Sequence, residues 1–303
     1  MSKTNTTQQT TNSQYRNATG ALSVTLRNDM MLHYTMQKSK RALKGLVCAL
    51  KGFDPETVYD VCLMNPIDYG SFGGKEIILD VKVTFNDSNI MDIELQMYYD
   101  AYWEQRSVLY LCRTYDTLDS GEDYKQLKPA TFVAIVPKPL FPDHPEFYSK
   151  FLLLNEKYHY PYTSNFRLNV LDLSQTGLAT EEDRSSGLLH WAQMFLANSW
   201  EELKQIAAGD PAFEEVLDNM YTVNTIPEER TIFEAHQKYQ ALMSALKSDK
   251  EEYAAELAKK NIELAKKDTE LTKKDTELAK KDSELEKLRQ FMISKGYDPD
   301  NLE

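Results

Sequence analysis

The stretch from Lys75 to Met97, KEIILDVKVTFNDSNIMDIELQM, carries the clearest structural signal in the chain. From Ile77 onward its odd-numbered positions are apolar on both sides of the turn-forming residues NDSN at 86–89, and its even-numbered positions are mostly polar. An alternation with a period of two is typical of strands that bury one face. The stretch therefore predicts a β-hairpin with an apolar face and a polar face.

Two acidic residues of this hairpin are expected to face each other. Asp80 and Glu94 are symmetric about position 87, and Gln96 has the same parity, so all three project from the polar face. Carboxylates on opposite strands, with Cβ atoms ~5 Å apart, repel when both are ionised. A hard divalent cation between them, Mg²⁺ or Mn²⁺, would remove this repulsion. The alternative is a solvent-exposed face on which the acids merely alternate.

The remaining pattern predicts a chain that mixes strands with helices. Apolar residues at spacings of three and four predict a helix within 22–50, and an aromatic and arginine-rich segment after the hairpin predicts another at 98–115. Short apolar runs predict strands at 131–136, 151–154 and 166–173. After Gln175 the pattern is helical. An α/β fold follows.

Composition excludes several classes of protein. The 303 residues carry a net charge of −12, which excludes binding of nucleic acid through overall basicity. No run approaches the ~20 apolar residues of a membrane helix, and the first residues lack a secretory pattern. The three cysteines are far apart, which favours a reducing cytoplasm, and no histidine pair has metal-ligand spacing.

The C-terminal region is an internal repeat of seven residues. From Lys259 the units KKNIELA, KKDTELT, KKDTELA and KKDSELE follow one another. Glutamate precedes lysine by four residues in each of the first three units, an arrangement that stabilises a helix. A long charged helix is therefore expected. Its leucines alone make a narrow seam, so either a partner-dependent coiled coil over 251–292, joining copies of the chain, or a solitary helix fits the pattern.

A family resemblance adds to this interpretation. The run LDVKVTFNDSNIMDIELQ and the following WEQRSVLYLCRTYDTLDSGEDYKQLKPA resemble the PD-(D/E)xK nuclease superfamily, and more closely the Rpn-like recombination-promoting nucleases described as PD-(D/E)xK family transposases. Shorter segments, among them Asn65-Pro66 and Trp200-Glu201-Glu202-Leu203, resemble family segments in the expected order over about residues 25–240. The resemblance implies a restriction-endonuclease-like core, a mixed sheet flanked by helices, that cuts DNA with a divalent metal.

The resemblance also assigns roles to the hairpin residues. Asp80 matches the motif aspartate and Glu94 the second acid, so both would be metal ligands together with the Leu95 backbone carbonyl. Mg²⁺ is the expected ion, with Mn²⁺ as the substitute. Gln96 stands where the wider superfamily has lysine. It cannot act as a cation, but it can position a water by hydrogen bonds.

Four further residues are auxiliary candidates. Lys82 lies on the same strand face as Asp80 and is either a migrated catalytic lysine or an exposed strand lysine. Arg106 and Tyr110 match the family's R-S-x-x-Y, and the arginine either contacts a phosphate or packs over an aromatic ring. Asp29 resembles an auxiliary acid of the first helix, and its alternative role is an N-cap.

These observations predict a tail at 1–20, a nuclease core at 21–175, a helical region at 176–250, the heptad helix at 251–292 and a tail at 293–303. The expected function is metal-dependent hydrolysis of DNA phosphodiester bonds, in a recombination, mobile-element or defence context. The competing hypothesis is a degenerate member that binds DNA or protein without cutting and oligomerises through its C-terminal helix.

Overall fold

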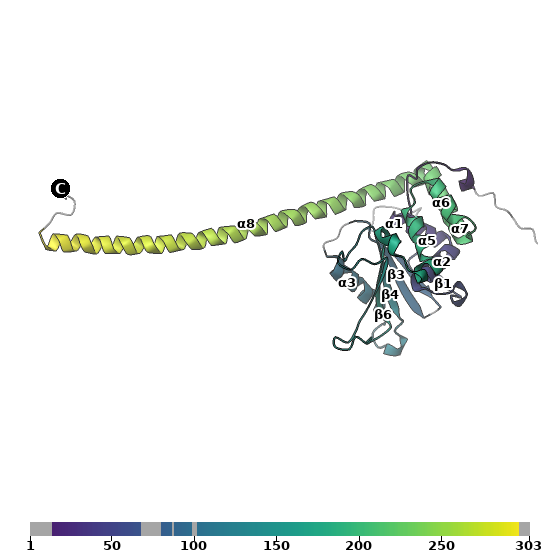
Figure 1. The fold of residues 1–303 in the computed structure, drawn as a ribbon, viewed down its shortest axis with the longest axis horizontal. Coiled ribbons are helices and arrows are strands. Elements are labelled where there is room, and N and C mark those ends of the chain that lie inside the picture. Colours follow the sequence, from purple (N-terminus) through teal and green to yellow (C-terminus); the bar gives the residue numbers. More distant parts are fainter. Residues whose placement is uncertain (1–13, 68–79, 87, 99–101, 297–303) are drawn as a thin grey trace, which may run out of the picture. The chain divides into compact units, whose positions relative to one another are not determined.

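The computed structural model describes residues 14–67, 80–86, 88–98 and 102–296. The chain divides into two units, residues 1–244 and residues 245–303. The first unit contains the sheet and the helices that pack on it, and the second contains the distal part of one long helix (Figure 1).

The first unit is built on a six-stranded mixed sheet in the order β1-β2-β3-β4-β6-β5. Pairing is antiparallel from β1 to β3, parallel through β3, β4 and β6, and antiparallel again at the edge strand β5. The strands are β1 (Val61–Leu63), β2 (Val81–Phe85), β3 (Asn89–Leu95), β4 (Ala130–Val136), β5 (Tyr148–Leu152) and β6 (Phe166–Asp172). The predicted hairpin is present as β2 and β3, although residues 75–79 of its first arm lie outside the described residues. The three residues of β1 were too few for the sequence pattern to predict.

The two faces of the sheet are covered by different helices. Helix α3 (Trp103–Tyr115) packs against the face that carries Phe132 and Ala134, and helices α1 (Asp29–Lys38) and α2 (Lys40–Lys51) lie on the face that carries Val133 and Ile135 (Figure 1). All seven residues of β4 are buried, because this central strand has helices on both faces. The mixed sheet flanked by helices confirms the expected fold class.

The first helical segment differs from the single pattern expected within 22–50. Ser39 has an extended backbone that ends α1, and its hydroxyl accepts a hydrogen bond from the Ala42 backbone N–H at the start of α2. A serine that caps a new helix is a common place for a chain to turn. The sequence periodicity continued across Ser39 because both helices bury apolar residues in the same core.

Helices α4 (Glu181–Ser185), α5 (Leu188–Leu196), α6 (Trp200–Ala207) and α7 (Pro211–Thr225) follow the sheet. Side chains of α5 to α7, among them Trp191, Phe195 and Leu217, belong to the same buried cluster as α1, α2 and the odd-numbered face of β2 and β3. Tyr15, in a 3-10 turn at Gln14–Asn17, is buried in that cluster too. Segments 14–17 and 188–223 therefore share one core with the sheet.

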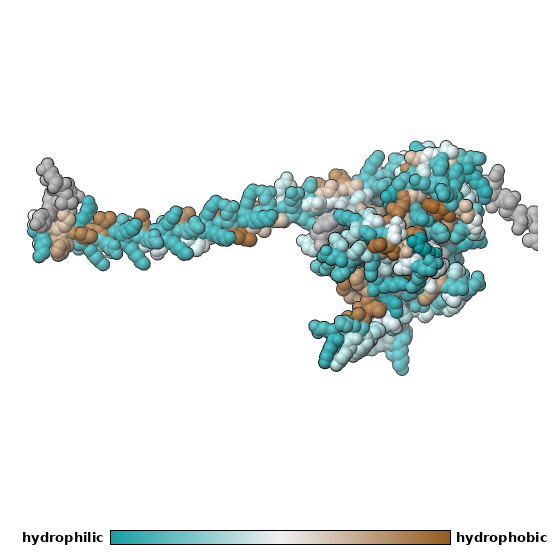
Figure 2. Space-filling model, viewed as in Figure 1, coloured by the Kyte–Doolittle hydropathy of each residue, from teal (hydrophilic) through white to brown (hydrophobic). Residues whose placement is uncertain are grey.

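Helix α8 (Pro227–Ser294) confirms the expected long charged helix. Within the second unit the repeat leucines are exposed, from Leu264 at 57% to Leu257 at 62%, and the surface in Figure 2 is largely hydrophilic with separate small apolar patches. In the described residues, no helix has the length and apolar character needed to span a bilayer.

A buried asparagine joins the chain's beginning to α7. The Asn224 side chain accepts hydrogen bonds from the Ser23 and Val24 backbone N–H groups, at 3.1 and 2.9 Å, and donates to the Val24 carbonyl at 3.0 Å. We expect Asn224→Ala to lower the free energy of unfolding by about 2–3 kcal/mol, because it leaves buried backbone groups without partners. Chemical denaturation measures this. Thr225→Ala, an exposed neighbour, should change stability by less than about 1 kcal/mol, and equal losses would contradict the assignment.

Candidate active site

The hairpin register places Asp80 opposite Glu94. Val81 pairs with Ile93, and continuing this antiparallel register by one residue brings Asp80 to Glu94. Even-numbered residues of both strands point to the face that α3 covers, opposite the core that holds Val81 and Ile93. The predicted pair is therefore formed by neighbouring strands, 14 positions apart in the chain, at the carboxyl end of β3.

These carboxylates are not on a solvent-exposed face. Glu94 is 4% exposed, and the neighbouring Asp92, on the same face, is 8% exposed. The alternative of a merely polar outer face is therefore wrong for β3, because α3 packs over it. Burial, followed by the charges of Glu94 and Asp92, raises the pKa of Asp80 to about 8. Asp80 consequently holds a proton at neutral pH when no cation is close.

Arg106 supplies the nearest positive charge. Its guanidinium on α3 forms a salt bridge with the Glu94 carboxylate, and the same group lies over the Tyr110 ring, 5.1 Å from its centroid. Tyr110 in turn contacts Phe132 of β4 edge-on. Arg106 thus packs over an aromatic ring and also pairs with a carboxylate. It reaches the Tyr110 ring because residues 106 and 110 are one helical turn apart.

A third carboxylate, Asp92, was not singled out as a candidate. Its Oδ2 accepts a hydrogen bond from the Thr114 hydroxyl at 3.0 Å, and its Oδ1 has no hydrogen-bond partner in the described part of the chain. Burial raises the pKa of Asp92, while Thr114 and Lys82 act in the opposite direction. Lys82 is its cross-strand partner. The shared even parity of residues 80, 92 and 94 was the signal that could have found it.

Gln96 lies just beyond the end of β3. Its backbone N–H donates to the Ile135 carbonyl at 2.9 Å, and its side-chain Nε2 donates to the Tyr98 carbonyl at 2.6 Å. The Tyr98 hydroxyl donates to the Gln237 carbonyl on α8 at 3.2 Å. Leu95, the residue whose carbonyl is a candidate ligand, is the last residue of β3 and pairs with Ile135. The segment after Glu94 is thus held by hydrogen bonds to β4 and to the first turns of α8, near Gln237.

Asp29 is not the N-cap of the first helix. Asn28 holds that position, and its side chain accepts a hydrogen bond from the Met31 N–H. The Asp29 carboxylate instead lies 3.0 Å from His236 Nε2 and accepts a hydrogen bond from Gln240, both on α8. Its charge contributes last among the causes that raise the pKa of Asp80. Asp29 therefore lies near the carboxylate pair but is engaged by α8.

The donor set suits a hard divalent cation. Asp80 and Glu94 offer two facing carboxyl groups, and a bound cation would favour the ionised form of Asp80. Asp92, on the same strand face, has one oxygen without a hydrogen-bond partner among the described residues. Within the described ranges, no three histidine, cysteine, aspartate or glutamate side chains converge into a metal centre. Two carboxylates plus water are a usual set for Mg²⁺, which retains several of its waters.

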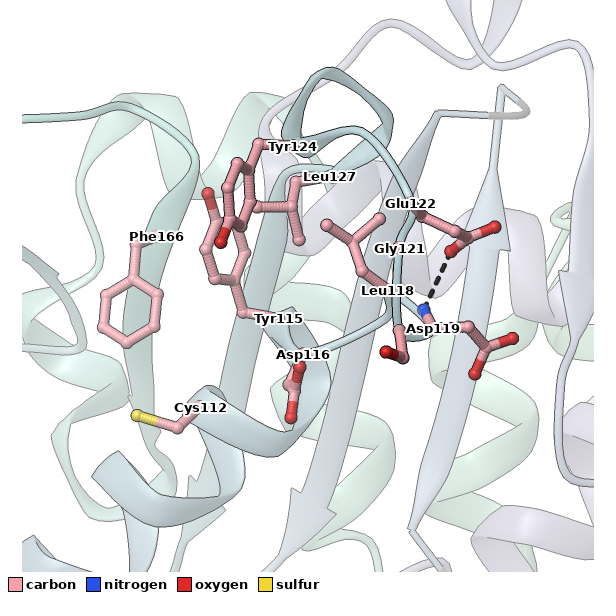
Figure 3. A pocket seen from close by; sticks show the side chains of 11 residues that line it. Cys112, Tyr115, Asp116, Leu118, Asp119, Gly121, Glu122, Tyr124, Leu127 and Phe166 are labelled. Carbon is pink, nitrogen blue, oxygen red and sulfur yellow. Dashed lines mark hydrogen bonds between the residues drawn. The ribbon is translucent and has the colours of Figure 1, made fainter.

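A separate cavity lies at the other end of the sheet. It has a volume of about 470 Å³, and Tyr115, Asp116, Glu122, Tyr124 and Phe166 are among the residues that line it (Figure 3). Phe166 pairs with Ala130, whereas Glu94 pairs with Ala134, so about 13 Å of strand separates the two places. The cavity contains none of the predicted site residues.

The raised pKa of Asp80 makes a prediction for stability. Because its pKa is about 8 in the folded protein and about 4 in the unfolded chain, stability should fall as pH rises from 5 to 8 without metal. We expect Asp80→Asn to remove this dependence and to stabilise the protein at pH 8 by on the order of 3 kcal/mol. Urea denaturation in EDTA at both pH values measures it.

The control for this experiment is Asp60→Asn. Asp60 is an exposed acid paired with Lys40, and this contact lowers its pKa, so it is ionised at both pH values. Its variant should show the wild-type pH dependence. Parallel profiles for wild type and Asp80→Asn would contradict the assignment.

Comparison with known proteins agrees with the geometry. Residues 32–249, more than two thirds of the chain, match the family described as PD-(D/E)XK nuclease family transposase. The matched range contains Asp80, Glu94, Gln96 and Arg106. Neither the curated proteins nor the solved structures contain a match. The mixed sheet, the facing carboxylates and this match together establish that the chain belongs to the PD-(D/E)XK nuclease family transposases.

Proposed function

We propose that this protein is a metal-dependent DNA endonuclease that hydrolyses phosphodiester bonds in a mobile-element or recombination context. The observation that carries the proposal is the placement of Asp80 opposite Glu94 on a buried strand face, where burial and then the acidic neighbours raise the pKa of Asp80. Membership of a nuclease family supports it. A divalent cation bound between the two carboxyl groups would favour the ionised form of Asp80 and give both groups a positive partner.

Each site residue has a role in this proposal. Asp80 and Glu94, with the Leu95 carbonyl, would hold Mg²⁺, or Mn²⁺ in its place. A bound ion of this kind lowers the pKa of a water and stabilises developing negative charge on a phosphate. Gln96 would orient that water through its side-chain amide. Arg106, once Glu94 has another positive partner, would be available to a phosphate oxygen.

The net charge of −12 affects how such an enzyme meets DNA. An acidic protein gains little from nonspecific attraction to phosphates, so productive binding depends on the cleft itself. We propose that this limits damage by a cytoplasmic nuclease. A homo-oligomer through 251–292 would bring two sites to one duplex. The exposed leucines are compatible with this arrangement, which stays a proposal.

One contact favours the competing function, a member that binds without cutting. Arg106 already neutralises Glu94, which is the place of the expected metal, and Gln96 replaces the superfamily lysine. A permanently held arginine would exclude the ion. Metal-dependent cleavage separates the two functions.

The test is cleavage of supercoiled plasmid with Mg²⁺, Mn²⁺ or EDTA. We expect nicking or linearisation that requires metal and falls at least about 100-fold in Asp80→Ala and Glu94→Ala, because each substitution removes a ligand. Asp60→Asn, which alters a surface acid, should retain full activity. No cleavage by folded wild-type protein with any of these metals would favour the binding function.

A second comparison separates Gln96 from Lys82. Lys82 lies opposite Asp92, so its charge already has a carboxylate neighbour, two residue pairs away from Asp80 in the strand register. We expect Lys82→Ala to keep cleavage within about threefold of wild type, and Gln96→Ala to lose about tenfold or more, as loss of an acid–base or positioning group does. Initial rates at saturating Mg²⁺ measure this. The reverse order would identify Lys82 as a migrated catalytic lysine.

A further inference from the structure

On the edge that faces β1, the start of β2 is held by a side chain rather than by a strand. Strand β1 ends at Leu63, and the Met64 N–H still donates to the Lys82 carbonyl at 2.7 Å. Beyond this point the Asn65 amide continues the pairing. Its Nδ2 donates to the Asp80 carbonyl at 2.6 Å, and its Oδ1 accepts from the Lys82 N–H at 3.2 Å.

Asn65 therefore brackets the backbone on both sides of Val81. The residue after it, Pro66, has no N–H, so backbone pairing with β2 cannot be continued there by a donor. An asparagine side chain has the same donor and acceptor groups as a peptide unit and can replace it. The consequence is that the backbone carbonyl of Asp80 is tied to the segment following β1.

The segment that carries Asn65 is itself held by two side chains of α1. His33 Nε2 donates to the Asn65 carbonyl at 3.0 Å, and burial lowers the pKa of this histidine. The Gln37 amide makes two hydrogen bonds with the backbone of Ile67, each 2.8 Å long. His33 and Gln37 are four residues apart, so they lie on one face of α1. The segment 65–67 is thus fixed before it contacts Asp80.

We propose that Asn65 is a positioning residue that holds Asp80 in register opposite Glu94. This inference rests on the proposed metal-dependent nuclease function. The Asn65 amide holds the Asp80 carbonyl, so the strand end that carries this carboxyl group keeps the position opposite Glu94 that the β2–β3 register gives it. Groups that orient a ligand without touching the metal typically change metal affinity 10–100-fold when removed.

The experiment measures Mn²⁺ binding by calorimetry and the Mg²⁺ concentration that half-activates plasmid cleavage. We expect Asn65→Ala to weaken Mn²⁺ binding about 10–100-fold and to shift half-activation in the same direction, with a smaller change in the rate at saturating Mg²⁺. Asn65→Asp keeps the acceptor for Lys82 and replaces the donor to Asp80 by a charge. It should lose at least as much affinity.

The matched control is Asn86→Ala. Asn86, at the other end of β2, also bonds the backbone twice, donating to the Thr57 carbonyl at 2.9 Å and accepting from the Tyr59 N–H at 3.0 Å. It should lower the melting temperature but leave Mn²⁺ affinity within about twofold of wild type. If Asn65→Ala does not fold, Asn65→Asp and Gln37→Ala carry the test, and both must weaken Mn²⁺ binding.

The outcomes separate the inference from the function on which it rests. Wild-type protein that binds Mn²⁺ and cleaves DNA, with Asn65 variants that match it in metal affinity, would overturn the positioning role alone. Equal loss of affinity in Asn65→Ala and Asn86→Ala would also overturn it, because general destabilisation would then explain the effect. Wild-type protein that neither binds Mn²⁺ nor cleaves would overturn the proposed function and the inference together.

Discussion

The antiparallel pairing of β2 with β3 is the constraint on which the rest of this protein depends. It sets two carboxylates, Asp80 and Glu94, opposite each other on a face that α3 buries. Burial and the closeness of a second acid are both unfavourable for an ionised carboxylate, and together they raise the pKa of Asp80 to about 8. The hydrogen bonds of the ladder and the apolar side chains on the opposite face offset this cost, because they fix the strands whatever the even-numbered face carries.

A positive charge and backbone hydrogen bonds reach the pair from two different elements. Arg106 comes from α3, and Asn65 comes from the segment after β1. Helix α1 connects these elements with α8, since Asp29, His33 and Gln37 follow one another at four-residue intervals and bond α8, Asn65 and Ile67 respectively. These three residues on one face of α1 thereby connect the first part of α8, near His236, with the segment that holds the Asp80 backbone.

The C-terminal half of the chain contributes to stability in its first part and presents an exposed surface in its second. Helices α5 to α7 contribute to the core on the odd-numbered face of β2 and β3, opposite the face that carries the carboxyl groups. The repeat leucines beyond Ser244 are exposed in the single chain, and aspartate or asparagine at most of the flanking seam positions leaves only a narrow apolar stripe. The part of the chain that supports the carboxylates therefore buries its apolar side chains, whereas the part that carries the repeat leaves them exposed.

The sequence by itself determined the hairpin, the shared face of residues 80 and 94, and the long charged helix, since period-two alternation and i,i+4 pairs act between residues close in the chain. Only the tertiary structure decided that this face is buried and that Arg106 neutralises Glu94. It also decided that Asn65 supports Asp80, and that Asp29 is engaged by His236, 207 positions away. Those contacts join segments whose local patterns are independent of each other, so they form only when the core brings the segments together.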